Sequence, residues 1–388
     1  MKAIAQIMGS GLAFGLAAIS GLAQAQPTQA PAKGWELGAV LDVASNSRPL
    51  ALGQRQQGLA LGHSDLVARG PLGTHFSAQA GLAAHSHGSS YEVELEEAWL
   101  QSRSLPAGWQ ARAGRFASQI GALNEQHPHA DDFVERPLLY RSLLGGHWFD
   151  DGLRLNWTAP TSFYLGLGAE VFRGRQLVQE SGSSPAVGAA TLRLKLGDDW
   201  GRAHSWQWGV SYLNNRREAL EEGHGDEHGE AHEEGHDDHA GHAHGAKLSG
   251  RHVWMTDLAW KWAPDGNNRQ QQLRLLAEYA QVSGINRHAS SGDQHRALAL
   301  SAVWRFSQQW ELGLRGDWLR ASMPHGDHFH AAEVAEQSLM LAWKPSHAQT
   351  LRLQLSTQNR VQDVEGASPR SVLLQYVLSF GAHGAHSF

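Results

Sequence analysis

The chain has 388 residues, a formal net charge of −6, 15 tryptophans and no cysteine. Without cysteine it has neither disulfides nor thiolate metal sites. Beyond the N-terminal segment, no apolar run reaches the roughly 18 residues that a membrane-spanning helix needs, which excludes a helical membrane protein. The sequence also has no Gly-Lys-Ser/Thr phosphate loop and no G-x-S-x-G elbow, so we expect no enzyme and no required cofactor.

The N-terminal segment has the composition of a secretory signal peptide. Lys2 precedes a stretch of small and apolar residues, and Ala23-Gln24-Ala25 has the A-x-A form of a cleavage site. We therefore predict a signal peptide over residues 1–25 and a secreted mature chain. Residues 26–388 show no break in composition, so we expect them to form a single domain.

Apolar and polar residues alternate along most of the mature chain. In residues 351–356, three leucines alternate with Arg352, Gln354 and Ser356, which puts apolar side chains on one sheet face and polar ones on the other. A soluble β-sandwich shows the same alternation. These segments, however, have at least the roughly 9–11 residues that a tilted strand needs to cross a bilayer, and the arginines of their polar face suit a water-filled lumen. Sixteen strands are predicted, at residues 35–44, 57–69, 72–83, 91–103, 108–117, 150–158, 161–174, 186–197, 203–216, 250–263, 270–283, 293–307, 309–321, 334–345, 348–361 and 369–380.

The predicted connections alternate between short and long. Short ones contain turn residues such as Pro71 and Pro106, and the long ones cover residues 45–56, 84–90, 118–149, 175–185, 217–249, 284–292, 322–333 and 362–368. Bacterial barrels combine an even strand number with short periplasmic turns and long outer loops. We therefore predict an all-β fold: a transmembrane antiparallel β-barrel of about 16 strands (14–18) in the Gram-negative outer membrane, with short periplasmic turns and long extracellular loops.

The connection 118–149 is long without being low in complexity, which is typical of a functional loop. Its leucines and aromatics are too apolar for a solvated loop, so it either folds into the lumen and narrows it or packs over the barrel mouth. Five arginines in or beside it are candidates for lining a charged constriction: Arg112, Arg115, Arg136, Arg141 and Arg154.

The connection 217–249 is rich in histidine and carboxylates. Ten carboxylates and no Lys or Arg lie between Glu218 and Ala246, together with His224, His228, His232, His236, His239, His242 and His244. Neutral imidazole is a preferred ligand of zinc, copper and nickel, and carboxylates complete the coordination shell. We expect this extracellular loop to bind several metal ions loosely; the alternative is a solvated acidic loop without a ligand.

Two further histidine groups lie in connections on the same predicted side. His127 and His129 belong to the segment 118–149, and His325, His328 and His330 belong to 322–333. The second group offers three nitrogens beside the Asp327 carboxylate, which is a candidate ligand set for a transition metal. Each group is equally compatible with ordinary surface histidines.

Apolar and aromatic residues lie on one face of the last predicted strand, and an aromatic residue ends the chain. Val372, Leu374, Tyr376 and Phe380 share one face, and the terminal Phe388 falls in the same phase. A C-terminal aromatic that closes an alternating strand resembles the assembly signal of outer-membrane barrels. We therefore expect the barrel-assembly machinery and outer-membrane lipids as partners.

Residues 93–157 resemble a group of porin-like outer-membrane proteins whose genes accompany zinc-uptake systems. They share a run from GRF through LNEQHPH and PLxYRxLLGG to DDG, an internal His/acid-rich loop and a GAHGAH tail, here residues 381–386. The group is distantly similar to phosphate-selective porins, whose inward loop contains an element like Phe133-Val134-Glu135-Arg136 here. Some relatives are described as TonB-dependent receptors, but this chain is too short for a plug domain and a 22-strand barrel.

The resemblance implies a barrel and a link to zinc. We expect a porin-like channel that captures zinc, or copper or nickel, on His-rich outer loops and passes it passively to the periplasm. The alternatives are a general or anion-preferring porin with an incidental loop, and a barrel-anchored surface metal buffer. We expect no nucleic acid as a partner, and a homotrimer is a candidate assembly.

Overall fold

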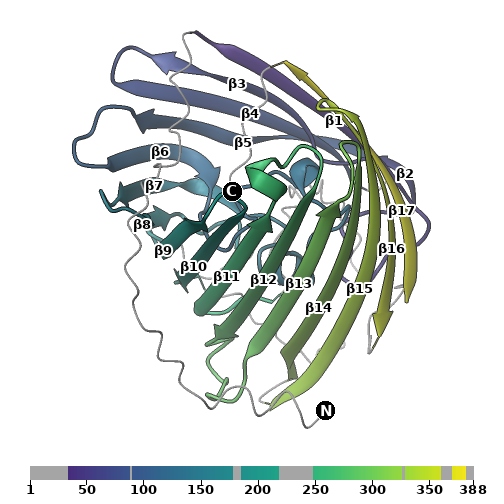
Figure 1. Ribbon diagram of the computed structural model, residues 1–388. Helices are drawn as coiled ribbons and strands as arrows, with labels where there is room; N and C mark the ends of the chain where they lie inside the picture. The colour runs from purple at the N-terminus through teal and green to yellow at the C-terminus, as the bar shows by residue number, and fades with distance from the viewer. Residues whose placement is uncertain are drawn as a thin grey trace.

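The computed structural model describes residues 34–87, 90–177, 185–217, 248–325, 328–359 and 369–381. Most of these residues belong to one antiparallel sheet that closes into a barrel (Figure 1). Its strands are Glu36–Asn46 (β1), Gly58–Leu61 (β2), Ser64–Leu72 (β3), Phe76–His87 (β4), Ser90–Ser102 (β5), Trp109–Ala117 (β6), Phe149–Thr158 (β7), Tyr164–Phe172 (β8), Ala189–Trp200 (β9), His204–Asn215 (β10), His252–Trp262 (β11), Gln272–Ser283 (β12), His295–Arg305 (β13), Trp310–His325 (β14), His328–Ser346 (β15), Gln349–Asn359 (β16) and Arg370–Gly381 (β17). The helical elements of the described residues are Pro128–Ala130 (η1), Leu138–Leu143 (α1) and Pro264–Gly266 (η2).

The barrel has sixteen strands because β2 and β3 are two parts of one strand. Both pair with β1, β2 through Ala44↔Ala60 and β3 through Ala39↔Leu66. On its other edge, β1 pairs with β17 in a register that sets Asp42 opposite Val377. Figure 1 shows this seam, where the purple β1 lies beside the yellow β17. The predicted closed antiparallel barrel is therefore confirmed.

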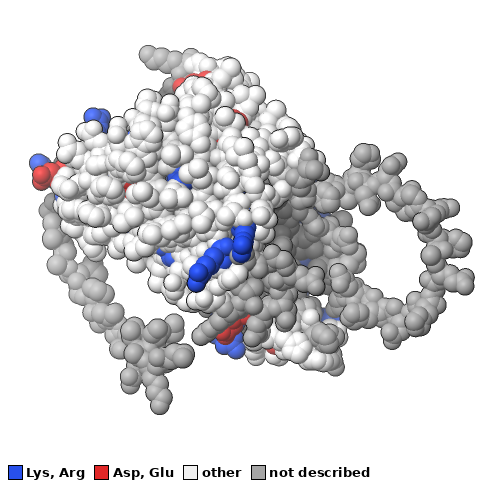
Figure 2. All heavy atoms as spheres, turned by 90° about the vertical axis from the view of Figure 1, so that its right-hand side faces the viewer, with Lys and Arg blue, Asp and Glu red and all other residues white. Residues whose placement is uncertain are grey.

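The alternation in the sequence corresponds to an apolar outer face and a polar lumen. On β16, Leu353 and Leu355 are 40% and 43% exposed, whereas Arg352 and Gln354 between them are 4% and 0% exposed. Figure 2 shows a broad wall surface almost without charged side chains, which appear mainly at its margins. A side chain that faces lipid must be apolar, while the lumen accepts polar groups that are hydrogen-bonded.

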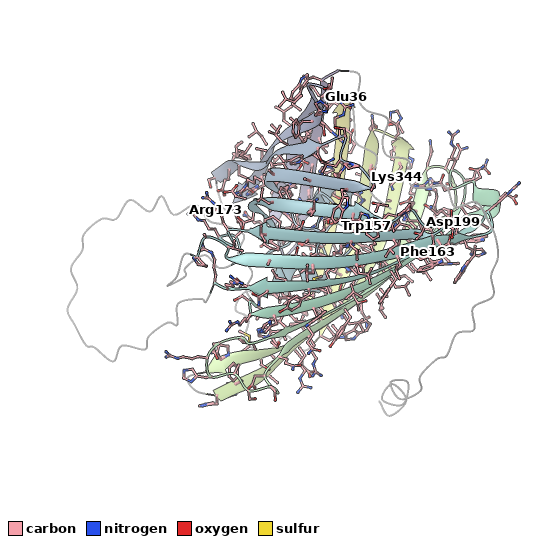
Figure 3. The ribbon with its side chains drawn as sticks, turned by 90° about the vertical axis from the view of Figure 1, so that its left-hand side faces the viewer. Glu36, Trp157, Phe163, Arg173, Asp199 and Lys344 are labelled. Carbon is pink, nitrogen blue, oxygen red and sulfur yellow. The ribbon has the colours of Figure 1, made fainter. Side chains whose placement is uncertain are left out.

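Aromatic side chains gather at the end of the barrel that carries the short turns. Trp109 and Trp157 lie 6.3 Å apart between ring centroids, and Trp310 and Trp343 lie 6.2 Å apart. In Figure 3, Trp157 lies toward the end marked by Phe163 and Asp199, opposite Arg173. Such a band matches the aromatic girdle of outer-membrane barrels.

Two predicted long loops are instead continuations of strands. β4 and β5 extend over most of the predicted loop 84–90, and β14 and β15 continue to His325 and His328, which face each other in the ladder. The prediction of a loop over 322–333 was therefore wrong. The apolar alternation fades where a strand leaves the membrane, because both of its faces are then solvated, although its backbone pairing continues.

Several sequence predictions lie outside the described residues. They are the signal peptide at 1–25, the histidines of the 217–249 loop, and the terminal Phe388. Among the residues that the structure covers, no helix is long and apolar enough to cross a membrane.

Candidate functional site

The segment 118–149, which runs from the end of β6 to the first residue of β7, lies against the lumen face of the wall. Its Leu138, Leu139 and Tyr140 are at most 1% exposed and belong to one apolar cluster with Met255 of β11 and Leu319 of β14. The Tyr140 hydroxyl donates a hydrogen bond to Glu278 Oε1 of β12 at 2.5 Å. Of the two alternatives for this apolar segment, the structure therefore shows the one in which it folds inward. We call residues 118–149 the inward segment.

Asn124 ties the two ends of the inward segment together. Its amide nitrogen donates to the carbonyl oxygens of Ser118 and Trp148 at 2.8 and 3.0 Å, and its Oδ1 accepts from the Trp148 backbone at 2.7 Å. Asn124 is fully buried, so losing these bonds would leave polar groups without partners. The segment consequently behaves as a closed loop that points into the barrel.

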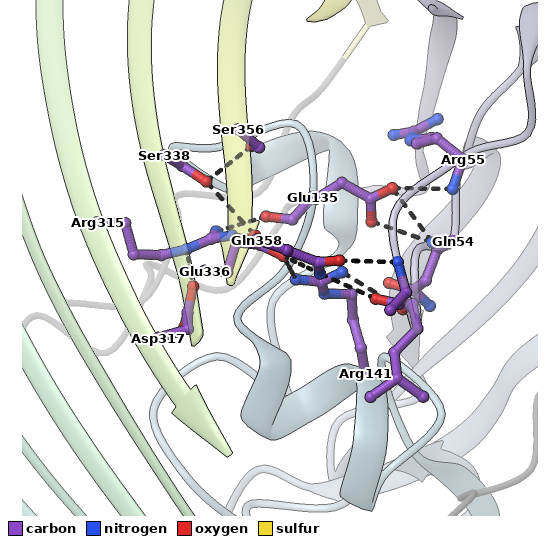
Figure 4. Close-up of polar contacts among 12 residues, drawn as sticks. Gln54, Arg55, Glu135, Arg141, Arg315, Asp317, Glu336, Ser338, Ser356 and Gln358 are labelled. Carbon is purple, nitrogen blue, oxygen red and sulfur yellow. Dashed lines mark hydrogen bonds and ion pairs between the residues drawn. The ribbon is translucent and has the colours of Figure 1, made fainter. Parts of the chain in front are cut away.

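Buried ion pairs join the inward segment to the strands on one side of the lumen. Arg141 Nη2 lies 2.5 Å from Glu336 Oε2, and Arg315 Nη2 lies 2.9 Å from Glu336 Oε1 (Figure 4). Arg315 also donates to the carbonyl oxygen of Glu135 and pairs with Asp317. Each charge has a partner of opposite sign, which compensates for its removal from water.

The five predicted constriction arginines occupy different surroundings. Arg136 and Arg141 lie in the inward segment at 2% and 3% exposure, and Arg154 of β7 pairs with Glu170 and Glu125. Arg112 lies over the Trp99 ring at 4.1 Å and bonds Gln101. In the alternation of β6, Arg115 falls on the same face as the exposed Trp109. Its Nη1 lies 3.8 Å from Asp151 Oδ1.

On the opposite wall, imidazoles and carboxylates converge at one point. His63 Nε2 lies 3.0 Å from Asp65 Oδ1, 3.0 Å from Glu96 Oε2 and 3.3 Å from His127 Nδ1. His127 Nδ1 lies 3.0 Å from Asp65 Oδ2 and 3.6 Å from Glu96 Oε2. One ligand atom from each of these four residues lies within 4.8 Å of all the others. We call His63, Asp65, Glu96 and His127 the lumen cluster.

These spacings fit a bound metal ion. Four ligands at ~2.0–2.1 Å from a tetrahedral zinc ion lie ~3.3 Å from one another, close to the distances within the lumen cluster. His63, Asp65 and Glu96 are 7%, 6% and 3% exposed, so water competes little for these atoms. Two nitrogens and two carboxylate oxygens form a donor set that suits zinc, copper or nickel.

A β-bulge in β5 brings an additional carboxylate to the lumen. Gly81 pairs with Glu97 while Leu82 pairs with Leu95, so Glu96 has no opposite residue on β4. The extra residue lets two consecutive glutamates, Glu96 and Glu97, both be buried at 3% and 7% exposure. In a regular strand, one of the two would face lipid.

Two further histidines contact the carboxylates of the lumen cluster. His129 Nδ1 lies 3.1 Å from Asp65 Oδ2, and His147 Nε2 lies 3.0 Å from Glu96 Oε1. Burial lowers the pKa of His129 to about 4 against the opposing charge of Asp65, and burial lowers the pKa of His147 to about 4 despite Glu96. Both imidazoles are therefore neutral at pH 7 and can orient these carboxylates by hydrogen bonds.

His127 has the opposite behaviour. Burial acts to lower its pKa, but the charge of Asp65 and hydrogen bonds to Asp65 and Glu97 outweigh burial and raise its pKa well above the usual value. A positive charge is thus strongly favoured at this point of the lumen. A divalent cation would supply that charge without a proton on His127.

The remaining predicted ligands are not part of this cluster. His328 and His330 lie on β15, with ring centroids 5.6 Å apart, and His325 is at the end of β14. The seven histidines of the 217–249 loop are outside the described residues. Of the predicted metal ligands, the lumen cluster contains His127, and His129 lies next to it.

Sequence reasoning missed three members of the cluster: His63, Asp65 and Glu96. The consecutive Glu96-Glu97 pair, which interrupts the alternation of a predicted strand, is the one local signal of a bulge. His63 and Asp65 lie within a predicted strand, and only the inward fold of the segment after β6 brings His127 beside them.

Comparison with known proteins supports the architecture. The chain is 12% identical to the anion-selective porin from Comamonas acidovorans, with a TM-score of 0.54 over 90% of this chain and 99% of that one. The fold is that of the outer-membrane porins. OprB of Pseudomonas putida is 12% identical with a TM-score of 0.54, covering 90% of this chain and 94% of that one. A trimer form of OmpT, an outer membrane protein of Vibrio cholerae, gives 7% identity and a TM-score of 0.52 over 89% and 99% of the two chains.

In sequence, the chain is 28% identical over 369 residues to an uncharacterized protein of Aquifex aeolicus (strain VF5), covering 86% of this chain and 71% of that protein. No family model matches the chain.

Proposed function

We propose that this chain is a porin-like channel of the Gram-negative outer membrane that captures zinc, or a similar divalent transition metal, and passes it to the periplasm. The lumen cluster is the observation that carries the proposal. It offers two imidazoles and two carboxylates at metal-ligand spacing inside a barrel of porin fold. The metal is cargo here, and the cluster is where it would pause on its way through.

The surroundings of the cluster favour a cation. On β5, Glu92 and Glu94 lie on the same lumen-facing side as Glu96 and Glu97. The ion would therefore arrive along a strip of carboxylates. Imidazole ligands favour zinc, copper and nickel over magnesium and calcium, which prefer oxygen ligands alone. The His-rich loop 217–249 would raise the metal concentration at the outer mouth, and flux would be passive.

An anion-preferring porin is the second candidate. Arg193, Lys195, Lys261 and Arg274 share the lumen phase on β9, β11 and β12, and one structural relative is described as an anion-selective porin. In that case, the lumen cluster would be incidental to permeation. Homotrimers, for which the OmpT trimer form gives a precedent, would be compatible with both candidates.

Zinc uptake into proteoliposomes tests the proposal. We expect a zinc-sensitive dye inside the vesicles to report influx through the full-length chain, and influx through His63→Ala to be much slower. His85→Ala is the matched control, because His85 contacts Glu92 at 3.6 Å on the same wall but is outside the cluster. Chloride conductance without zinc influx would favour the anion porin. Zinc binding without any conductance would favour a surface metal buffer anchored by the barrel.

A further inference from the structure

The four residues of the lumen cluster belong to two different parts of the molecule. His63 lies in the short break between β2 and β3, Asp65 lies on β3 and Glu96 lies on β5, so all three belong to the wall. His127 immediately precedes η1 in the inward segment. A metal ion bound to all four would therefore join the inward segment to the wall.

The wall side of this junction is rigidly placed. The His63 backbone nitrogen donates to Asp42 Oδ2 at 3.1 Å, and Arg55 pairs with the same oxygen at 2.7 Å. Asp42 in turn accepts from Gln375 of β17 at 2.9 Å. The backbone of His63 therefore has a defined position before any ion arrives.

The two halves of the inward segment are attached to the wall differently. Residues 131–144 are held by the ion pairs with β14 and β15 and by the Tyr140–Glu278 hydrogen bond. Residues 125–130 contact the wall through the Glu125–Arg154 ion pair, a 3.3 Å bond from Arg352 to the His129 carbonyl oxygen, and the contacts of His127 and His129 at the cluster. The cluster is thus the main attachment of this half to β3 and β5.

We infer that the ion bound at the lumen cluster is a latch that fastens residues 125–130 to β3 and β5 and so regulates the lumen of the channel. The inference rests on the proposed function, because it uses the same metal site. A coordinated ion holds four side chains at once, whereas each hydrogen bond of the metal-free cluster joins only two of them. Removal of the ion would free residues 125–130 to move away from this wall, while 131–144 stay docked.

Pulsed electron paramagnetic resonance on the full-length chain in detergent measures this movement directly. The chain has no cysteine, so Ala130→Cys and Leu82→Cys give one unique pair of spin labels, from the inward segment to the outer face of β4. We expect a narrow distance distribution with zinc and a broad, shifted one with a chelator. For a control pair within the wall, Leu82→Cys with Leu300→Cys, we expect the same distance distribution with zinc and with a chelator.

Variants separate the latch from general damage. In His127→Ala the distribution should be broad with and without zinc, and Asp65→Asn, which keeps the side-chain shape, should behave in the same way. Both must retain the heat-modifiable mobility of a folded barrel. His85→Ala should respond to zinc as the parent does.

A zinc titration of the labelled protein distinguishes the two proposals. Zinc binding that requires His63 and His127 but leaves the label distances unchanged would overturn the latch and leave the proposed function intact. Absence of zinc binding at the cluster would overturn both. Binding together with narrowing of the distribution would establish the latch.

Discussion

Arg141 of α1 and Glu336 of β15 form an ion pair in the lumen in which neither side chain has any exposed area. The two residues are 195 positions apart in sequence, and Gln358 of β16 donates a further hydrogen bond to the same Glu336 oxygen. The contact therefore joins the inward segment to two neighbouring strands. A buried charge of this kind depends on its partner, because water cannot replace it.

Removing Arg141 is expected to release the second half of the inward segment. Arg141→Ala leaves Glu336 with one guanidinium, that of Arg315, and we expect the docked state to lose about 3–5 kcal/mol. Limited proteolysis within 118–149 measures this loss as faster cleavage of the intact barrel. Arg320→Ala is the control, because Arg320 and Glu333 form an exposed pair at 4.0 Å, which contributes about 0–1 kcal/mol. Equal cleavage rates for the two variants would show that the ion pair does not anchor the segment.

His147, which contacts Glu96 but is not a member of the lumen cluster, is expected to increase the zinc affinity of the cluster. His147→Ala removes the hydrogen bond to Glu96 but no ligand of the cluster, so zinc should bind about 10–100-fold more weakly. His63→Ala removes a ligand and should have a larger effect. Competition with a zinc-chelating dye gives both affinities, with His85→Ala as reference. A His147→Ala affinity equal to that of the reference would rule out its orienting role.

Deleting residues 221–245 is expected to remove weak, rapidly exchanging zinc sites and leave the lumen site. The loop imidazoles have an ordinary pKa of about 6.5, and only neutral imidazole binds metal, so their binding should weaken between about pH 7.5 and 5.5. Calorimetry on the parent and deletion proteins counts both classes of site. If the two proteins bind the same number of zinc ions, the loop is not a metal-binding element.

Acid is expected to loosen the metal-free inward segment. Because the pKa values of His129 and His147 are lowered to about 4 in the folded state, from about 6.5 in the unfolded state, their contribution is present above pH 6.5. It is lost as pH falls from 6.5 to 4, by up to about 1.4 kcal/mol per pH unit for each histidine. His127, with its raised pKa, has the opposite sign and stabilises the docked segment below pH 6.5.

The spin-label pair on Ala130 and Leu82 measures the net effect in chelator at pH 7 and pH 5. A broader distribution at pH 5 is expected in the parent, and a smaller change in His147→Gln. A narrower distribution at pH 5 would mean that His127 dominates.

The strands of the barrel were predictable because each one obeys a local rule. Leu353 must face lipid and Arg352 must not, and this requirement repeats every two residues across the bilayer. The apolar composition of the inward segment likewise indicated burial, although not on which side. The pairing of β14 with β15 as far as His325 and His328 escaped prediction because the rule no longer applies outside the membrane.

Of the four residues of the lumen cluster, only His127 could be predicted as a metal ligand from the sequence. Asp65 and His127 meet because the inward segment reaches one particular wall of the barrel, and this contact is not encoded in a short window of sequence. Glu96 depends on a bulge that shifts the phase of β5 by one residue. Contacts of this kind, between residues far apart in sequence, are defined only once the sheet is complete.

The seam between β1 and β17 also sets the order of events during biogenesis. Gln375 and Asp42, which bond across it, are 333 residues apart, so the edge of β1 that faces β17 has no permanent neighbour until β17 has been delivered. An open strand edge is a template for aggregation, and closing so long a loop costs conformational entropy. The first strand must therefore be shielded while the others are added. In a circular permutant with new ends at a periplasmic turn, β17 and β1 would follow each other directly in the chain. This permutant would form the seam early, and the edge of β1 would not be left open.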